Sequence, residues 1–347
     1  MNDTTFAKAG ILMLILVGLS LVSWEFYVRN KGFDLSYDDA GPLWTDKRKQ
    51  VYESPDQSTV FIGSSRIKFD LDIQTWENIT GDHAVQLACI GSTPLPILKN
   101  LADDKKFAGK LVIDVTEGLF FSGSPNNADR PLTNLSYYKD ETPAQWASFQ
   151  LNHLLESKLA FLDKDRLSLN AMLSETHIRN RPGVFEFPGF PPGFGHVKFN
   201  RQEYLTDKFI TDTAQQNRVK GVWRFVKEMS KEPPASGAKL DSILLSVKTD
   251  VDKIKARGGL VIFVRTPSSG PFLQGELKGF PREKYWERIL STTQSTGIHF
   301  LDYPAISHFE CPEFSHLTQS DAILFTREFI RILTEEKGWR FPQMARR

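Results

Sequence analysis

The chain has 347 residues, of which 24% are charged and 40% apolar, and these proportions exclude wholesale disorder. Its 43 Lys and Arg residues balance 42 Asp and Glu residues. The net charge of +1 therefore lacks the excess of positive charge that sequence-independent binding of nucleic acid requires. The short basic run Lys47–Lys49 is predicted to be a solvated surface. Two cysteines exclude a disulfide-dense scaffold and a four-cysteine zinc site, and a mean hydropathy of −0.31 excludes a polytopic membrane protein.

An apolar N-terminal stretch carries no charge from Ala9 to Trp24. With its apolar and aromatic neighbours it reaches the length needed to cross a hydrocarbon core of about 30 Å. The sequence therefore predicts a transmembrane signal anchor over residues 1–30, single-pass in the inner membrane, with the rest of the chain periplasmic or otherwise extracytoplasmic. A cleaved signal peptide and a buried core helix are the alternatives. The flanking charges do not decide the orientation; a cytoplasmic N-terminus is favoured because no later segment is suited to span.

Residues 31–57 are predicted to form a juxtamembrane connector with a helix around Leu43–Tyr52. Strand-like and helix-like patterns then alternate. Continuous apolar runs of this length are typical of strands buried on both faces of a parallel sheet. They are predicted at Thr59–Ile62, Ala84–Ile90, Leu111–Val115, Gly259–Val264 and His299–Tyr303. Helices are predicted at Pro94–Asp104, Leu240–Ala256, Arg282–Thr293 and Ser320–Glu336.

This alternation predicts an α/β domain over residues 58–337 with a doubly wound, parallel, five-stranded sheet. Residues 122–237 interrupt the pattern and are predicted to be a helical and loop insertion, with helices at Pro143–Leu162 and Asp207–Met229. Within it, the aromatic Pro/Gly/Phe loop Val184–Phe199 is interpreted either as a lid or acyl-binding wall, or as a packed irregular loop. Residues 338–347 are predicted to be a C-terminal tail.

Chemically active side chains follow several of the predicted strands. In an open α/β sheet, ligands bind outside the carboxyl ends of the strands. The segment at residues 63–66, GSSR, follows the first strand, Gly91 follows the second, and Arg265 follows the fourth. Glu313 and His316 lie on the loop before the last helix. A hydroxyl, a base, an acid and backbone donors for an oxyanion are the groups that nucleophilic catalysis requires.

The order of these motifs resembles that of the SGNH (GDSL-type) hydrolase superfamily. The GSS segment at residues 63–65 stands where that family has Gly-Asp-Ser, which implies that Ser65 is the nucleophile. Gly91 falls at the family's oxyanion-hole glycine, His316 at its catalytic base, and Glu313 at the aspartate three residues earlier. The resemblance therefore implies a Ser-His-Glu triad in an SGNH (flavodoxin-like) fold.

The resemblance covers residues 58–122 and 238–337, and the chain departs from it at the third motif, Gly-x-Asn-Asp. The sequence VTEG stands there at residues 115–118, so the asparagine that donates to the oxyanion is absent. Losing one such donor costs on the order of 100- to 1000-fold in rate. The hydroxyl of Thr116 is predicted to replace it, beside the backbone amides of Ser65 and Gly91.

Other assignments stay open at this point. The GSS segment also fits a plain strand-to-helix turn with a serine N-cap. Glu310 and Asp302 are alternatives to Glu313 as the acid that orients the histidine. An extracytoplasmic location permits a disulfide between Cys89 and Cys311, which sequence alone does not establish.

Arg66 and Arg265 are predicted to contact the substrate or to complete the oxyanion site, and a structural salt bridge is the alternative for Arg265. No HExxH, CxxC, P-loop or GxGxxG motif is present. The sequence therefore predicts neither a metal site nor a cofactor.

The function expected from these residues is a membrane-anchored serine esterase or O-acyltransferase. Its expected substrate is an acyl ester, acetyl foremost, of a cell-envelope glycan. This architecture is similar to that of the DltD proteins of teichoic-acid D-alanylation, which implies a membrane-bound O-acyltransferase as a partner. A non-catalytic carbohydrate-binding or assembly module of the same fold is the alternative. A lipase-like enzyme that uses the aromatic loop Val184–Phe199 as an acyl groove is a third hypothesis.

Overall fold

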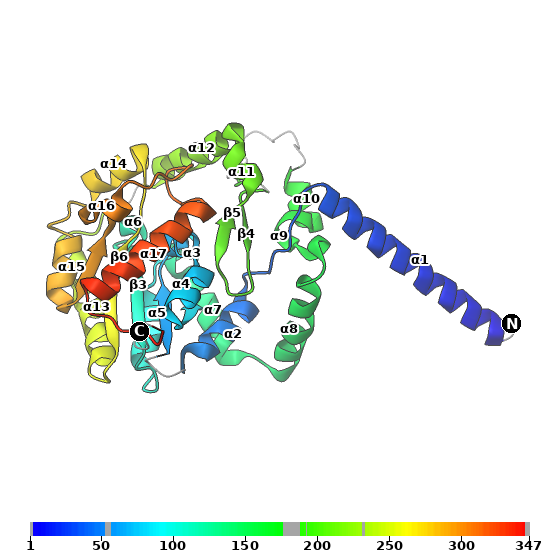
Figure 1. The fold of residues 1–347 in the computed structure, drawn as a ribbon, viewed down its shortest axis with the longest axis horizontal. Helices are drawn as coiled ribbons and strands as arrows, with labels where there is room; N and C mark the ends of the chain where they lie inside the picture. The colour runs from blue at the N-terminus through cyan, green and yellow to red at the C-terminus, as the bar shows by residue number, and fades with distance from the viewer. Residues whose placement is uncertain (1–2, 53–56, 176–187, 192, 231–232, 344–347) are drawn as a thin grey trace.

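The computed structural model describes residues 3–52, 57–175, 188–191, 193–230 and 233–343. Helix α1, Asp3–Asn30, projects away from the rest of the molecule (Figure 1). Its segment Thr5–Asn30 is long and apolar enough to cross a membrane, and its most apolar window is 0% buried. The helix therefore fits a single-pass anchor and is not a core helix of the domain.

Five parallel strands form one sheet in the order β2-β1-β3-β6-β7. Strand β1 lies between β2 and β3, with Val60 opposite Val85 on one side and Leu111 on the other. The predicted α/β class with a parallel five-stranded sheet is confirmed. The strands are β1 Ser58–Ile62, β2 His83–Gln86, β3 Lys110–Asp114, β6 Leu260–Arg265 and β7 Thr296–His299.

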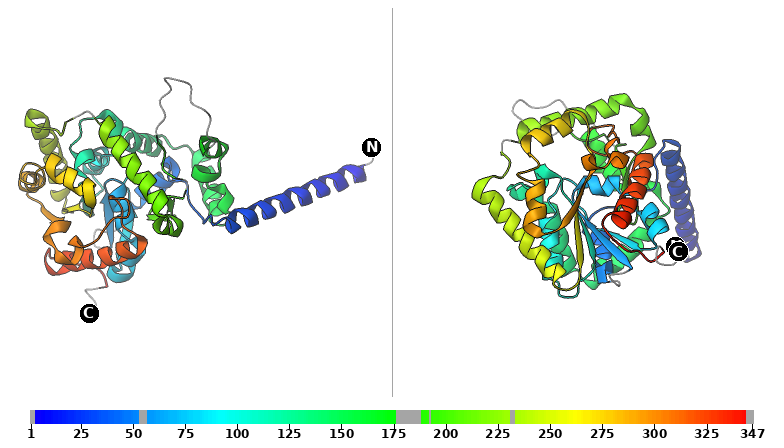
Figure 2. Two further views of the ribbon diagram at one scale, coloured as in Figure 1. Left: turned by 90° about the horizontal axis from the view of Figure 1, so that it is seen from above. Right: turned by 60° about the vertical axis from the view of Figure 1, so that its left-hand side comes forward.

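Helices cover both faces of this sheet, as Figure 2 shows. Successive strand residues point to opposite faces, so Val60 and Ile62 enter one apolar core and Phe61 enters the other. The first core is closed by α2, α5, α13 and α15, and the second by α3, α4, α16 and α17. Burial on both faces explains why the strands are continuous apolar runs.

The helices of the domain outside the insertion have the following bounds. They are α2 Gly41–Lys49, α3 Ser65–Asp70, α4 Ile73–Thr80, α5 Leu95–Asp103, α6 Glu117–Phe120, α13 Gly237–Lys255, α14 Gly270–Gly279, α15 Trp286–Thr293, α16 Pro304–Ser307 and α17 Gln319–Glu335, with 3₁₀ turns at Gln50–Tyr52 and Phe300–Asp302. The helix α17 was expected at nearly these bounds, and Thr318 caps it by accepting a hydrogen bond from the Asp321 amide.

The predicted bounds of the last strand are wrong. Strand β7 ends at His299, and a 3₁₀ turn occupies Phe300–Asp302, which the sequence assigns to the strand. The His299 ring caps this turn by accepting a hydrogen bond from the Leu301 amide at 3.3 Å. Continuous apolar character predicted burial here correctly but did not distinguish a strand from a tight turn.

The insertion is more structured than predicted. It contains α7 Asp129–Asp140, α8 Pro143–Glu156, α9 Lys164–Leu167, α10 Leu169–Glu175, α11 Asp207–Thr211 and α12 Thr213–Met229, with 3₁₀ turns at Pro125–Ala128 and Ala160–Leu162. An antiparallel hairpin of β4 Gly195–Val197 and β5 Glu203–Leu205 completes it. Part of the predicted aromatic loop, residues 184–187 and 192, lies outside the described residues, and its end forms strand β4.

The connector after α1 packs onto the domain. Trp44 of α2 is fully buried and donates its indole N–H to the Leu87 carbonyl at 3.0 Å. The predicted solvated surface at Lys47–Lys49 is wrong at two of its residues. Lys47 and Arg48 are buried, and Arg48 pairs with Asp104 at 2.9 Å, because α2 lies against the sheet rather than in solvent.

Candidate functional site

The turn after β1 positions Ser65 at the first residue of α3. Ser64 is the N-cap, and its hydroxyl accepts a hydrogen bond from the Arg66 amide. Gly63 is required because a Cβ there lies only 2.5 Å from the Cβ of Asp114. Ser64 thus takes the capping role that the sequence left open, and the Ser65 hydroxyl is free to face another partner.

That partner is His316, which the loop before α17 brings to Ser65 from 251 residues away. The Nε2 atom of His316 lies 2.9 Å from the Ser65 Oγ, and its Nδ1 atom lies 2.9 Å from the Glu313 Oε1. Glu313 Oε1 also accepts the His316 amide at 2.6 Å. Between them, Phe314 has a left-handed φ of 82°, a tight turn that places the carboxylate beside the ring.

The Ser65, His316 and Glu313 side chains form a hydrogen-bonded row, of which Ser65 is the most exposed member. Glu313 is fully buried, His316 is 1% exposed and Ser65 is 8% exposed. Burial by itself raises the pKa of Glu313, but the charge of His316 and hydrogen bonds from His316 and Trp223 outweigh it, so its pKa lies below the ordinary value. Glu313 is therefore ionised at neutral pH and holds the Nδ1 proton of the ring.

The alternative acids lie elsewhere. Asp302 pairs with Arg282 at 2.7 Å, and Glu310 is exposed. The structure thus brings Glu313, and neither of the two alternatives, to His316.

Trp223 is a site residue that the sequence analysis missed. It lies on α12 of the insertion and donates its indole N–H to the second oxygen of Glu313. Two further rings enclose His316: the centroid of Phe69 lies 4.3 Å and that of Phe194 5.8 Å from the imidazole. The insertion therefore supplies both a hydrogen bond to the acid and part of the apolar wall around the base.

Replacing Trp223 by Phe is expected to lower kcat for ester turnover roughly ten- to hundred-fold. A hydrogen bond to a charged group contributes about 1.5–3 kcal/mol, and the indole N–H is one of the groups that hold Glu313 in place. Loss of this donor raises the pKa of Glu313, so the acid limb of the pH–rate profile moves to higher pH. Trp146→Phe, on the exposed face of α8, is the matched control. An unchanged pH profile in Trp223→Phe contradicts the assigned role.

The predicted oxyanion donors lie at the same edge of the sheet. Beyond β2 the chain continues along β1, with the Cys89 amide bonded to the Gly63 carbonyl at 3.1 Å. Gly91 follows two residues later with a φ of +60°, which favours glycine. The Ser65 amide, at the first position of α3, is one of the helix amides that have no intrahelical partner.

Thr116 does not present a free hydroxyl. Its Oγ1 atom donates to Asp114 at 3.0 Å and lies 2.6 Å from the Ser64 Oγ. The predicted side-chain donor is thus already engaged within the turn, which corrects the expectation that this hydroxyl replaces the missing asparagine.

Arg66 and Arg265 were predicted to contact substrate, but each is 1% exposed and lies in a buried ion-pair cluster. Arg265 pairs with Glu117 at 3.1 Å, and both guanidinium groups pair with Glu276 of α14. Arg66 also donates to the hydroxyl of Ser315, the neighbour of His316, at 3.3 Å. The structural salt bridge, given as the alternative for Arg265, is what the structure shows, and Arg66 links the cluster to the histidine loop through Ser315.

A second buried carboxyl, Asp70, lies close to His316. It accepts the Leu317 amide at 2.9 Å through one oxygen, and its other oxygen has no hydrogen-bond partner among the described residues. Burial raises its pKa to about 7, although the charges of His316 and Arg66 and the Leu317 hydrogen bond act in the opposite direction.

Replacing Asp70 by Asn is expected to stabilise the protein at pH 8 and to have little effect near pH 4. Because the folded pKa lies above the unfolded one, the folded state binds the proton more tightly, and stability falls as pH rises from about 4 to 7. Asn keeps the acceptor for Leu317 and removes this loss. The measurement is Tm of the full chain in detergent at both pH values. Asp241→Asn, on the surface of α13, is the control, and an equal shift at both pH values contradicts the prediction.

Both cysteines are free thiols buried in the protein. Cys89 accepts a hydrogen bond from Asn134, and Cys311 lies 3.8 Å from the Pro267 carbonyl. The structure therefore does not contain the disulfide that the sequence permits. Within the described ranges, no group of three or more His, Cys, Asp or Glu side chains is placed to hold a metal ion.

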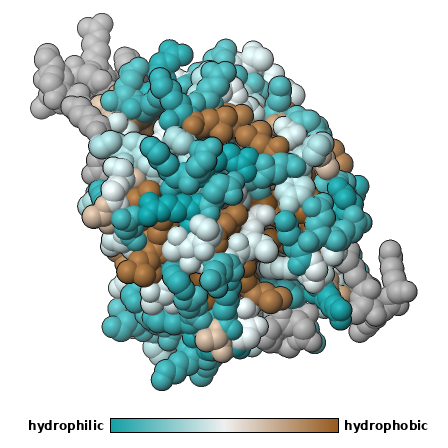
Figure 3. All heavy atoms as spheres, turned by 90° about the vertical axis from the view of Figure 1, so that its left-hand side faces the viewer, coloured by the Kyte–Doolittle hydropathy of each residue, from teal (hydrophilic) through white to brown (hydrophobic). Residues whose placement is uncertain are grey.

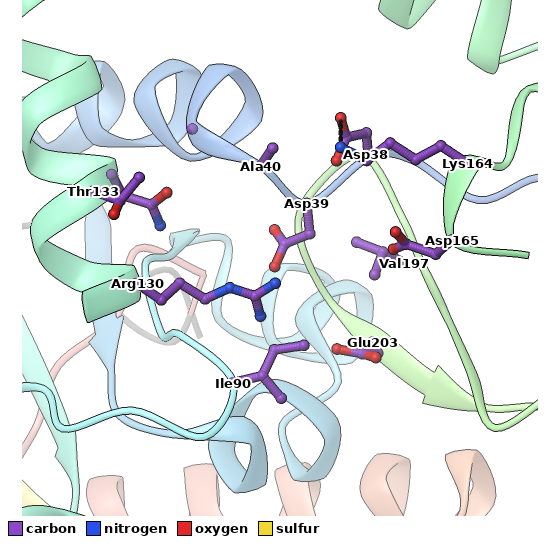
Figure 4. A pocket seen from close by; sticks show the side chains of 12 residues that line it. Asp38, Asp39, Ala40, Ile90, Arg130, Thr133, Lys164, Asp165, Val197 and Glu203 are labelled. Atoms are coloured by element: carbon purple, nitrogen blue, oxygen red, sulfur yellow. Dashed lines mark ion pairs between the residues drawn. The ribbon is translucent and has the colours of Figure 1, made fainter. Parts of the chain in front are cut away.

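A pocket of about 370 Å³ has Ile90 in its lining, and neither Ser65 nor His316 lines it (Figure 4). Arg130 of α7 extends into it, and Lys164 pairs there with Asp38. The remaining lining residues are Asp39, Ala40, Gly41, Thr133, Asn134, Asp165, Val197 and Glu203, besides Ile90. Most of its lining residues thus have polar or charged side chains, and the pocket adjoins the predicted oxyanion loop through Ile90.

Comparison with models of known protein families gives no match for this sequence, and comparison with curated proteins gives none either. The positions of Ser65, His316 and Glu313 around the sheet edge are therefore the observation on which an assignment of function rests.

Proposed function

We propose that the chain is a membrane-anchored serine esterase or O-acyltransferase with the doubly wound arrangement of the SGNH hydrolases. The observation that carries this proposal is the hydrogen-bonded row Ser65–His316–Glu313, with 2.9 Å between each histidine nitrogen and its oxygen partner. A hydroxyl within reach of an imidazole that is in turn held by a buried carboxylate is the arrangement of an activated nucleophile.

In the proposed mechanism, the Ser65 Oγ attacks an ester carbonyl while His316 Nε2 takes its proton. Glu313 stabilises the imidazolium through the Nδ1 proton. The Ser65 and Gly91 amides hold the tetrahedral oxyanion. His316 then gives its proton to the leaving alcohol, and acyl-Ser65 remains. Attack by water completes hydrolysis, whereas attack by an acceptor hydroxyl completes acyl transfer.

The proposed substrate is an acyl ester, acetyl foremost, of a cell-envelope glycan. The length and apolar composition of α1 support a site at an envelope membrane. The proposal places the domain on the extracytoplasmic side, with a membrane-bound O-acyltransferase as partner. The pocket beside Ile90 supports a hydroxyl-rich ligand, because carboxylate, amide and hydroxyl side chains such as those that line it can exchange hydrogen bonds with sugar hydroxyls.

A non-catalytic glycan-binding module is the second candidate, and the engaged hydroxyl of Thr116 favours it. Without a third oxyanion donor, the row Ser65–His316–Glu313 has less to stabilise the transition state.

A fluorophosphonate probe separates the two candidates. The full chain in detergent is treated with the probe, the adduct is located by mass spectrometry, and acetyl-ester turnover is measured with and without a glycan acceptor. Labelling at Ser65 that is lost in Ser65→Ala and His316→Ala is the expected result. Ser236→Ala is the control, because this serine lies at the start of α13 and its hydroxyl makes no cap hydrogen bond. This variant is expected to keep the labelling at Ser65. A chain that neither labels at Ser65 nor turns over ester refutes the proposed enzyme and favours the non-catalytic module.

A further inference from the structure

An exposed apolar surface runs along two helices of the insertion. We call it the insertion face, and its residues are Trp146, Ala147, Leu151, Leu154 and Leu155 of α8 and Leu169, Met172 and Leu173 of α10. Its leucines are up to 72% exposed, at Leu169. A contiguous exposed apolar surface of this kind marks a site that binds a membrane or another protein.

The insertion face points away from the body of the domain. On α8, Ala147 and the three leucines recur at i, i+4, i+7 and i+8, which places them on one side of the helix. On the other side, Phe149 is buried and stacks on Phe199. On α10, the three apolar residues are spaced i, i+3 and i+4, again on one side of the helix.

Hydrogen bonds join the end of helix α1 to the same part of the insertion. The Glu25 carboxylate of α1 accepts the amides of Ala160 and Phe161 at 2.9 and 3.1 Å, and Arg29 donates to the Lys158 carbonyl at 2.8 Å. These acceptors and donors lie directly after α8 and before α9. The end of α1 is therefore held in a fixed position beside the insertion face.

The same end of α1 carries the side chains that mark a bilayer surface. Trp24 and Tyr27 stack at 5.4 Å and remain exposed. Indole and phenol rings gather where the hydrocarbon core meets water. Since Glu25 lies between them and contacts residues 160–161, the bilayer surface comes level with the end of α8. Figures 1 and 2 show α8, α9 and α10 at the edge of the domain from which α1 leaves.

We propose that the insertion face lies in the lipid interface of the membrane that α1 spans. The apolar sides of α8 and α10 enter the boundary between headgroups and acyl chains, about 5–10 Å deep, as interfacial amphipathic helices do. Together with α1 they fix the orientation of the domain on the bilayer. The side turned away from α1, seen in Figure 3, is largely hydrophilic with hydrophobic residues among the polar ones, and it stays in water.

The test places an environment-sensitive dye on single introduced cysteines. Leu151→Cys and Leu173→Cys report on the insertion face, and Leu245→Cys, 63% exposed on α13, reports on the opposite part of the domain. The native Cys89 and Cys311 are buried, so the dye reacts at the introduced position. Each full chain is reconstituted alone in phosphatidylcholine–phosphatidylglycerol vesicles, with and without spin-labelled lipid. Leu14→Cys, 66% exposed within α1, verifies that the anchor spans the bilayer.

The proposal expects a blue-shifted emission and strong loss of fluorescence by spin-labelled lipid at positions 151 and 173, and neither at 245. Emission at 151 and 173 that is as red and as unquenched as at 245, while position 14 is quenched, overturns it and leaves a protein partner as the occupant of the insertion face. An unquenched position 14 overturns the membrane span on which the proposal rests. The two failures are thus distinguished by separate sites.

Discussion

Replacing Ser65 by Ala is expected to lower kcat for acyl-ester turnover by at least about 10⁴-fold, and His316→Ala by a similar factor. In a serine triad the nucleophile and its base act as one unit, and removing either removes nearly all of the covalent route. The 2.9 Å contact between the Ser65 Oγ and His316 Nε2 is the basis for expecting the same coupling here.

The coupling between Ser65 and His316 also predicts the activity of the double variant. If the two residues act in one step, the double variant Ser65→Ala, His316→Ala falls no further than either single variant. If the two residues contributed independently, the fold loss in kcat of the double variant would be the product of the two single losses. The measurement is kcat of all three variants with one activated acetyl ester, together with Tm to show that each remains folded. Turnover retained in Ser65→Ala, or losses that multiply, refutes the proposed nucleophile.

The parallel sheet was predictable because its strands are buried on both faces and therefore read as unbroken apolar runs. Thr59–Ile62 and Leu111–Val115 are examples, and the structure has β1 and β3 at nearly those residues. The hairpin β4–β5 was not predictable, since strands of three residues are too short to show alternation. Helix α14 was hidden by Gly270, Pro271 and two further glycines within its own span.

The candidate site, like the fold, was predictable only in part. The positions of Ser65 and His316 follow from local rules, since each lies on a turn at the carboxyl edge of the sheet. Trp223 was not predictable, because it lies 90 residues from Glu313 and its helix carries no sign of which side packs on the histidine loop. The interpretation of the arginines as substrate contacts failed for a related reason. Their shared partner, Glu276, lies on the helix that the sequence hid.

Replacing Glu313 by Gln is expected to lower kcat by about 10⁴-fold without unfolding the protein. In serine proteases, exchange of the triad carboxylate for an amide has this size of effect because it selects the wrong tautomer of histidine. Glu313 accepts the Nδ1–H of His316 through Oε1, the same oxygen that accepts the amides of Ser315 and His316.

An amide at position 313 keeps one oxygen and gains an N–H₂ group. The two backbone amides and Nδ1–H all require an acceptor at Oε1, whereas the indole of Trp223 requires one at Oε2. If the Trp223 indole keeps the amide oxygen as its acceptor, the amide nitrogen faces His316 and the two backbone amides. Nδ1 then becomes the acceptor, and the ring proton moves to Nε2. Nε2 then faces the Ser65 hydroxyl as a donor and has no lone pair with which to take its proton.

The double variant Glu313→Gln, Trp223→Phe tests this argument, because it removes the indole donor that opposes the other orientation of the amide. With Trp223 gone, the amide is free to keep its oxygen on Nδ1 and the backbone amides and to turn its nitrogen toward the vacated side. We therefore expect the double variant to recover part of the activity lost in Glu313→Gln, although Trp223→Phe alone lowers activity. Measured kcat values of the four proteins form a double-mutant cycle. A double variant no more active than Glu313→Gln shows that the negative charge of Glu313, rather than the tautomer it selects, is what His316 requires.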